Sequence, residues 1–439
     1  MKSKIKNNVK NNVLMPLQVF MRQEKSGGIV LAISVIIALI LANSPLAEWY
    51  THFFEYKIGV SLNGSVYMNY SIHQWINDGL MAMFFFVVGL ELKREFISGE
   101  LSKIRNTILP ICAAIGGMII PAVIYLIFNN GSTVVSGWGI PMATDIAFSL
   151  GILYLLGNKI PQSAKVFLTT LAIVDDLGAV IVIALFYTLE ISLLNLGIGF
   201  CFLVVMFVAN KMGVKNIIFY AILGIGGVWA SFLLSGVHAT IAAVLSAFVI
   251  PADSRISEHI FVARAKKLLN KFSQIKSSEF STLEANQVEI IDRIRTDANF
   301  AVPPLQRLEH AMHPMVSFII MPIFALSNAG ISFINIDFAS LFSTNVAIGV
   351  MFGLLLGKPI GIVGSTMIIT KLKIAAFPKT ITKRRIIGLG FLASIGFTMS
   401  MFVSTLAFTN HDNYVQAMVG IFSASILGGI IGYQLLKKA

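Results

Sequence analysis

The sequence is poor in charged residues and in cysteine. Only 12% of its 439 residues are charged, whereas 56% are apolar and the mean hydropathy is +0.81. An ordinary soluble domain has about 25% charged residues, and so few charges cannot cover the surface of a soluble chain of this size. A cytosolic enzyme and a secreted domain are therefore excluded. The two cysteines, Cys112 and Cys201, lie in apolar runs, so we expect neither a disulfide framework nor a cysteine metal site.

Long apolar stretches dominate the chain instead, and each has about the length of one membrane crossing, roughly 20 residues. We predict an all-α polytopic membrane protein with about twelve transmembrane helices, at residues 28–47, 74–92, 107–128, 137–156, 166–189, 191–209, 216–234, 238–251, 312–332, 345–369, 386–408 and 414–436. The domain organisation that follows is a cytoplasmic N-terminal segment at 1–27, helices 1–8 within 28–251, a cytoplasmic insert at 252–308 and helices 9–12 within 309–439.

Lysine and arginine gather in alternate connections. Of the 33 Lys and Arg residues, 31 lie in the two terminal segments and in every second loop. Positive charge stays cytoplasmic during insertion, so we expect both termini inside and an even number of spans. The net charge of +12 therefore reflects topology in a lipid bilayer and does not indicate nucleic-acid binding. The N-terminal basic region is long for a signal peptide and fits an uncleaved first span better.

Two connections have features of their own. Residues 58–70 alternate apolar and polar side chains around Asn63-Gly64, which predicts a short external β-hairpin with a type I′ turn. The hairpin either caps its loop or pairs its exposed edge with a second copy of the chain. The insert at 252–308 has an amphipathic patch around 256–272 and few residues for an independent core, so we expect it on the cytoplasmic membrane surface.

Asp145, Asp175, Asp176 and Lys358 are embedded in apolar sequence within the predicted spans. A charge at the bilayer centre costs about 2.5–3.5 kcal/mol even on the insertion scale, so such residues usually face a cavity and usually function. The alternative is that these residues only form ion pairs that hold helices together. One Lys cannot neutralise three Asp, so this alternative leaves two carboxylates unexplained. Since Asp175 and Asp176 are roughly 100° apart around one helix, we expect one to face a cation and the other to turn toward Lys358.

Glycine and proline predict two interrupted helices. Two glycines and Pro141 precede Asp145, and the span at 386–408 contains three glycines up to Gly396. Each break lies in the middle span of a triplet, and the two triplets have opposite orientations in the membrane. This is the layout of inverted repeats around a mid-membrane ion site.

The chemistry of these residues favours cation and proton exchange. Carboxylate oxygens suit hard cations such as Na⁺, Li⁺, H⁺ or Ca²⁺, and the absence of a Cys or His cluster at the same depth disfavours a transition metal. A buried carboxylate that holds either a proton or a cation, but not both, produces exchange directly. The sequence implies no cofactor.

The residues around these charges resemble the NhaA-type sodium/proton antiporter family. The motifs that carry the resemblance are Met142-Ala-Thr-Asp145-Ile-Ala-Phe-Ser, Leu171-Ala-Ile-Val-Asp175-Asp176-Leu-Gly-Ala, Gly89-Leu-Glu91-Leu-Lys-Arg-Glu95, Gly357-Lys358-Pro-Ile-Gly, Leu308-Glu309-His310-Ala-Met-His313-Pro and Gly396-Phe-Thr-Met-Ser. The likeness runs from about residue 20 to the C-terminus, apart from most of 255–305.

The resemblance implies a homodimer of the bacterial inner membrane, and a secondary active transporter in place of an enzyme. It would expel Na⁺ or Li⁺ electrogenically in exchange for inward H⁺, regulating cytoplasmic pH and sodium. Asp176 and Asp145 would serve the cation and the proton, with Thr144 nearby, and Asp175 would pair with Lys358. Matches to positions linked to pH regulation are Glu91, Glu95, Glu309, His310, His313 and His238.

Other interpretations stay open for part of this set. An aspartate at a helix break, such as Asp145, also offsets half-helix dipoles. Glu91 and Glu95 fit an ordinary ion-paired turn, and the three histidines fit surface or packing positions. The alternative function is a Na⁺-coupled solute symporter of related broken-helix architecture, although the Asp pair with Lys358 favours proton exchange. An intramembrane aspartyl protease is disfavoured because its sequence contexts are missing.

Overall fold

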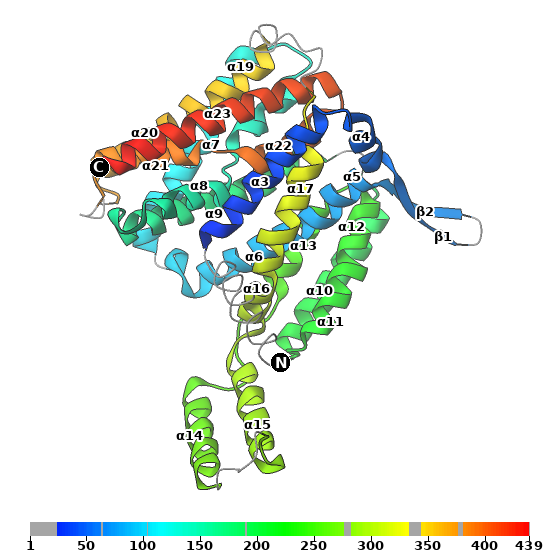
Figure 1. Ribbon diagram of the computed structural model, residues 1–439, viewed down its shortest axis with the longest axis vertical. Helices are drawn as coiled ribbons and strands as arrows, with labels where there is room; N and C mark the ends of the chain where they lie inside the picture. Colours follow the sequence, from blue (N-terminus) through cyan, green and yellow to red (C-terminus); the bar gives the residue numbers. More distant parts are fainter. Residues whose placement is uncertain are drawn as a thin grey trace, which may run out of the picture.

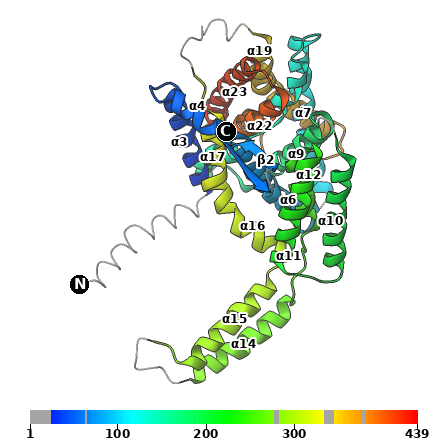
Figure 2. The same cartoon turned by 90° about the vertical axis from the view of Figure 1, so that its right-hand side faces the viewer.

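The computed structural model describes residues 24–62, 65–102, 104–188, 191–275, 282–332, 344–375 and 381–438. It is a bundle of helices with a small β-hairpin at one side and a pair of helices that projects from one end (Figures 1 and 2). Nine helices of these described ranges are long and apolar enough to cross a membrane, and two bent pairs raise the number to eleven. The apolar helix α13 is shorter. The prediction of an all-α polytopic membrane protein is confirmed.

Every apolar run predicted as a span coincides with a helix or a series of helices. Those of the first half are α3 (Glu24–Ala42), α5–η2–α6 (Ile72–Trp75, Ile76–Leu80, Met81–Ser98), α7 (Ile104–Asn129), η4–α8 (Val135–Met142, Ile146–Leu155), α9 (Gln162–Phe186) and α10 (Leu193–Lys211). Those that follow are α11–η6–α12 (Ile217–Ile222, Leu223–Trp229, Ala230–Ser235), α13 (Ala239–Val249), α16–η7–α17 (Pro304–Met315, Val316–Ile320, Met321–Asn328), α19–η8–α20 (Asn345–Phe352, Gly353–Gly357, Lys358–Lys371), α21–α22 (Lys383–Ala393, Phe397–Ala407) and α23 (His411–Lys437).

Shorter elements join these spans. Helix α4 (Ala47–Glu55) turns by 112° from α3, and the 3₁₀ turns η3 (Glu100–Ser102) and η5 (Gly157–Lys159) follow α6 and α8. Four of the spans contain a π-helical segment, namely η2, η6, η7 or η8. Of the N-terminal segment predicted at 1–27, residues 1–23 lie outside the described part.

The hairpin predicted at 58–70 is present. Strands β1 (Lys57–Leu62) and β2 (Ser65–Ser71) pair antiparallel, with Lys57 opposite Ser71 and a bulge between Ile58 and Val60. Its Asn63-Gly64 turn, for which we expect type I′ geometry, lies outside the described residues. The hairpin extends away from the bundle, next to α4 and α5 (Figure 1).

The insert forms a second hairpin, made of helices α14 (Glu258–Gln274) and α15 (Ala285–Ala301). The two helices pack on each other and project beyond the bundle (Figure 2). Its base is closed by the Arg255 N–H, which donates to the Phe300 carbonyl at 2.8 Å. The amphipathic patch around 256–272 is therefore helix α14, and its pairing with α15 is not foreseen by the sequence.

Small residues bring α7 and α20 into contact. A Cβ atom on Gly361 of α20 would collide with the carbonyl oxygen of Gly116 on α7, and one on Gly117 would lie 2.9 Å from the Ile362 side chain. Glycine at such contacts lets the backbones of membrane helices approach closely. This contact fixes the first turn of α20, which begins with Lys358, against the centre of the bundle.

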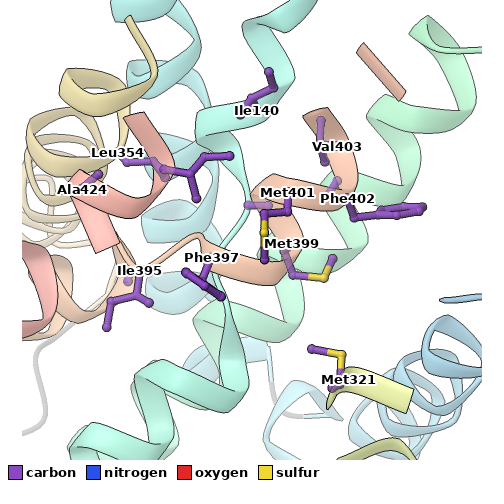
Figure 3. Packing of buried hydrophobic residues seen from close by; sticks show 14 of the residues in the cluster. Ile140, Met321, Leu354, Ile395, Phe397, Met399, Met401, Phe402, Val403 and Ala424 are labelled. Carbon is purple, nitrogen blue, oxygen red and sulfur yellow. The ribbon is translucent and has the colours of Figure 1, made fainter. Parts of the chain in front are cut away.

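Buried hydrophobic side chains surround α22, the second half of the broken span α21–α22, and Figure 3 labels its Phe397 and Phe402 among them. The Phe402 ring lies 5.5 Å from the Phe85 ring of α6 and 6.3 Å from the Phe324 ring of α17, measured between centroids. Phe397, at the start of α22, lies 5.0 Å from Phe148 of α8 in an edge-to-face arrangement. Such aromatic pairs contribute about 0.5–1.5 kcal/mol beyond the area they bury. The broken helix is thus held by α6, α8 and α17.

Candidate ion-binding site

The two predicted helix breaks meet in the middle of the bundle. The first separates η4 from α8 at residues 143–145, and the second separates α21 from α22 at residues 394–396 with a bend of 45°. The Asp145 N–H donates to the Ile395 carbonyl at 2.7 Å, and the Ser400 hydroxyl donates to the Ile140 carbonyl at 2.8 Å. Backbone groups freed by one break are therefore satisfied by the other helix, as a low-dielectric interior requires.

Asp145 caps two helices at once. Its Oδ1 accepts from the Phe148 N–H at 3.1 Å, which makes it the N-cap of α8. Its Oδ2 accepts from the Thr398 N–H at 3.0 Å and from the Thr398 hydroxyl, at the start of α22. A carboxylate at a helix N-terminus offsets the positive end of the helix dipole. This geometry favours the dipole-offsetting interpretation of Asp145.

Asp175 on α9 pairs with Lys358, as the family resemblance implies. Both side chains are fully buried, and the Lys358 ammonium contacts Asp175 Oδ2. Lys358 also donates to the Thr144 hydroxyl at 2.8 Å, and that hydroxyl lies 2.6 Å from Asp175 Oδ2 and 2.9 Å from the Ala393 carbonyl. The pair thus joins α9, α20 and both helix breaks.

Asp176 is the exception in this site. It is fully buried, and neither of its carboxylate oxygens has a hydrogen-bond partner among the described residues. Oδ1 of Asp175 is also without a partner within the same ranges. The carboxylate of Asp176 interacts electrostatically with Asp175, Asp145, Lys358 and Glu91. Three buried oxygens without partners suit a proton or a hard cation, because an unsatisfied buried carboxylate is strongly unfavourable.

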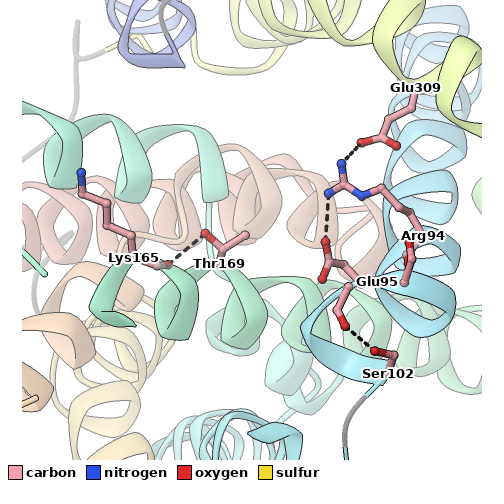
Figure 4. A network of polar contacts seen from close by, with 8 residues as sticks. Arg94, Glu95, Ser102, Lys165, Thr169 and Glu309 are labelled. Carbon is pink, nitrogen blue, oxygen red and sulfur yellow. Dashed lines mark hydrogen bonds and ion pairs between the residues drawn. The ribbon is translucent and has the colours of Figure 1, made fainter. Parts of the chain in front are cut away.

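Glu95 and Glu309 share one arginine at the end of α6 (Figure 4). The Arg94 guanidinium lies 2.9 Å from Glu95 and 2.7 Å from Glu309, which belongs to α16. Glu309 is 5% exposed, and its second oxygen has no partner among the described residues. Glu91 lies about one helical turn before Glu95 on α6 and interacts electrostatically with Glu309. The structure therefore brings these three glutamates together.

The three histidines are distributed differently. His310 and His313 are exposed on α16, and the described residues contain no group of three or more His, Cys, Asp or Glu that could hold a metal ion. His238 precedes α13, and its Nε2 lies 2.8 Å from the carbonyl oxygen of Tyr187, the residue that follows the C-terminal end of α9. His310 and His313 therefore lie next to the glutamates, whereas His238 does not.

Sequence reasoning missed two residues in these clusters. Thr398 binds Asp145 through its backbone and its hydroxyl, and its place in the Gly396-Phe-Thr break was an available signal. Lys93 donates to the carbonyl oxygens of Phe248, at 2.7 Å, and of Ile250, at the C-terminal end of α13. No sequence pattern connects residue 93 with residue 248, so the contact of Lys93 with α13 could not be predicted from the sequence.

Comparison with known proteins is consistent with this geometry. A family described as "Na+/H+ antiporter 1" matches residues 18–436. A Na⁺/H⁺ antiporter NhaA 1 of Clostridium beijerinckii is 44% identical over 437 residues, covering 100% of this chain and 98% of that protein. An NhaA of Wolinella succinogenes is 45% identical over 416 residues, covering 94% of this chain and 91% of that protein. The chain therefore belongs to the NhaA family of Na⁺/H⁺ antiporters.

Proposed function

We propose that this protein exchanges Na⁺ for H⁺ across the membrane at Asp176. The observation that carries the proposal is the buried Asp176 carboxylate, whose two oxygens have no partner in the described part of the chain. A proton satisfies this carboxylate in one state and Na⁺ satisfies it in the other. Because the two ligands exclude each other, a proton gradient drives sodium outward once the site opens alternately to the two sides of the membrane.

Asp175 and Lys358 extend the site. Asp175 Oδ1, which has no partner among the described residues, is a candidate second ligand for Na⁺ bound to Asp176. A cation at that point also repels the Lys358 ammonium, which lies on the other oxygen of Asp175. Loss of the Lys358 proton on Na⁺ binding supplies a second proton, so that more protons enter than Na⁺ ions leave. This proposal makes the exchange electrogenic, and Li⁺, a smaller hard cation, is the second substrate.

Access to the site alternates between the two sides of the membrane. Asp145, Asp175, Asp176 and Lys358 are at most 1% exposed, so neither side reaches them in this conformation. We propose that the ion site opens by movement of the two broken helices. Few backbone hydrogen bonds have to change partners at their breaks.

The setting and regulation are part of the same proposal. We place the protein in the bacterial inner membrane because of its resemblance to the NhaA family, and both termini in the cytoplasm because of its charge distribution. The exposed edge of the β1–β2 hairpin supports a homodimer. The cluster of Arg94 with Glu95 and Glu309, together with Glu91 and the neighbouring His310 and His313, supports control by cytoplasmic pH. His238, at a separate place, supports a response on the external side.

Asp176→Asn tests the proposed exchange. Asparagine keeps the size of the side chain but cannot bind a proton as an acid, so addition of NaCl should no longer collapse the pH gradient of everted vesicles. Asp292→Asn, which changes an exposed aspartate of α15, is the matched control and should exchange normally. Normal exchange by Asp176→Asn in equal amounts would overturn the mechanism. A response that requires an added organic solute would instead support the symporter.

A further inference from the structure

Helices α20 and α21 form a wedge that is closed at one end and open at the other. At the closed end a Cβ atom on Gly390 of α21 would lie 3.0 Å from the Pro359 Cα of α20. The other end of the pair is at Lys371, the last residue of α20, and Lys383, the first of α21. The two helices leave a cavity of about 410 Å³ between them.

The lining of this cavity has two parts. Its inner part, nearer to Pro359 and Gly390, contains Val363, Met367 and Ile386, and the buried Thr366, whose hydroxyl donates to the Ile362 carbonyl at 2.7 Å. Its outer part contains the two exposed lysines, Lys371 and Lys383, together with Thr370 and Ile381. On the outer surface of α20, Ile368 and Leu372 are 59% and 62% exposed, as expected for side chains that face lipid. The cavity is therefore amphipathic along its length and lies beside the bilayer.

The charge around the cavity is of one sign. The segment 371–385 contains six Lys or Arg residues and no Asp or Glu. Lys371, Lys373, Lys383 and Arg384 form no ion pair with any described residue, whereas Arg94, Arg264 and Arg293 elsewhere in the chain are paired with carboxylates. The partial positive charge at the N-terminus of α21 is offset by the partial negative charge at the C-terminus of α20, so the positive charge comes from the basic side chains.

We propose that this wedge binds an anionic phospholipid, with its phosphate between Lys371 and Lys383 and an acyl chain along Val363 and Met367. The apolar side chains of the inner part favour a phospholipid over free phosphate, because phosphate has no apolar group that could contact them. Basic cavities between membrane helices on the cytoplasmic side are suited to such head groups.

The bound lipid would set the spacing of two helices that reach the ion site. Helix α20 begins with Lys358, and α21 ends at Ala393, whose carbonyl lies 2.9 Å from the Thr144 hydroxyl. This consequence for transport rests on the proposed function, whereas lipid binding does not. A binding measurement therefore separates failure of the lipid site from failure of the exchange mechanism.

The test is thermal unfolding of the purified full chain in detergent, titrated with dioleoyl phosphatidylglycerol. We expect the lipid to raise the melting temperature, and phosphatidylcholine and millimolar inorganic phosphate to leave it unchanged. In Lys371→Gln/Lys383→Gln the half-saturating lipid concentration should rise about 25-fold, equivalent to about 1 kcal/mol for each lysine. Lys371→Arg/Lys383→Arg should retain the shift.

Lys159→Gln/Lys438→Gln is the matched control, because it removes two exposed charges that do not line the cavity. It should respond like the unchanged protein. An equal loss of affinity in this control would show diffuse surface attraction and overturn the site. An unaltered response of Lys371→Gln/Lys383→Gln would do the same. An equal response to inorganic phosphate would make the ligand a free anion and overturn the lipid.

Discussion

Three aspartates in one buried site differ in how many of their carboxylate oxygens have a hydrogen-bond partner. Asp145 has hydrogen bonds on both oxygens, Asp175 has its contacts on one, and Asp176 has none within the described residues. Since free oxygens are what a cation or a proton needs, this order ranks their suitability for transport. In the proposed mechanism, identical side chains thereby divide the roles of helix cap, ion-pair partner and ligand.

At the same scale, Lys358→Ala should destabilise the protein. Removal of one partner of a buried ion pair typically costs about 3–5 kcal/mol, because the survivor is left uncompensated. The second change, Asp175→Asn, should restore part of that loss by removing the orphaned carboxylate. Detergent melting temperatures of the two single variants and the double variant measure the coupling. Strictly additive losses would mean that the Lys358–Asp175 contact contributes nothing to stability.

Among the elements, the sequence predicted what depends on local pattern. Both helix breaks follow from glycine and proline, and the hairpin follows from alternation around Asn63-Gly64. The burial cost of the charges predicted that one of the two adjacent aspartates pairs with Lys358, and the family resemblance identified it as Asp175. The crossing of the two breaks, the sharing of Arg94 and the pairing of α14 with α15 depend on which helices become neighbours. The local pattern of a single sequence does not show which distant helices pack together, so these contacts could not be predicted from it.

The contact of α20 with α7 gives a prediction at the level of elements. Gly361→Ala should destabilise the protein by about 1–3 kcal/mol, since its Cβ atom would collide with the Gly116 carbonyl and push α20 outward. Exchange should fall as well, because Lys358 moves with that helix. Gly364→Ala on the same helix is the control: nothing lies within 4 Å of its Cβ atom. If melting temperature and exchange change equally in both variants, the contact does not position the site.

For the whole molecule, the bundle and the α14–α15 hairpin are separable. Helix α14 buries no residue and α15 buries only Gln287, while the hairpin's two ends meet at Arg255 and Phe300. Replacing residues 256–299 by a short glycine linker should therefore leave membrane insertion, melting temperature and vesicle exchange nearly unchanged. A clear loss of exchange in a normally inserted variant would place the hairpin within the transport machinery.

The complete transport cycle gives a prediction that needs no mutation. If Na⁺ and H⁺ compete for Asp176, a tenfold rise in proton concentration should raise the apparent KM for Na⁺ up to about tenfold where only the carboxylate titrates, and by more where the Lys358 proton is released as well. The maximal rate at saturating Na⁺ should change far less, since enough Na⁺ displaces the proton. Initial rates in vesicles across a range of pH measure both quantities. A constant KM with a falling maximal rate would instead identify a separate gate, and the glutamates that share Arg94 would be its first candidates, because they lie outside the ion site and join α6 to α16.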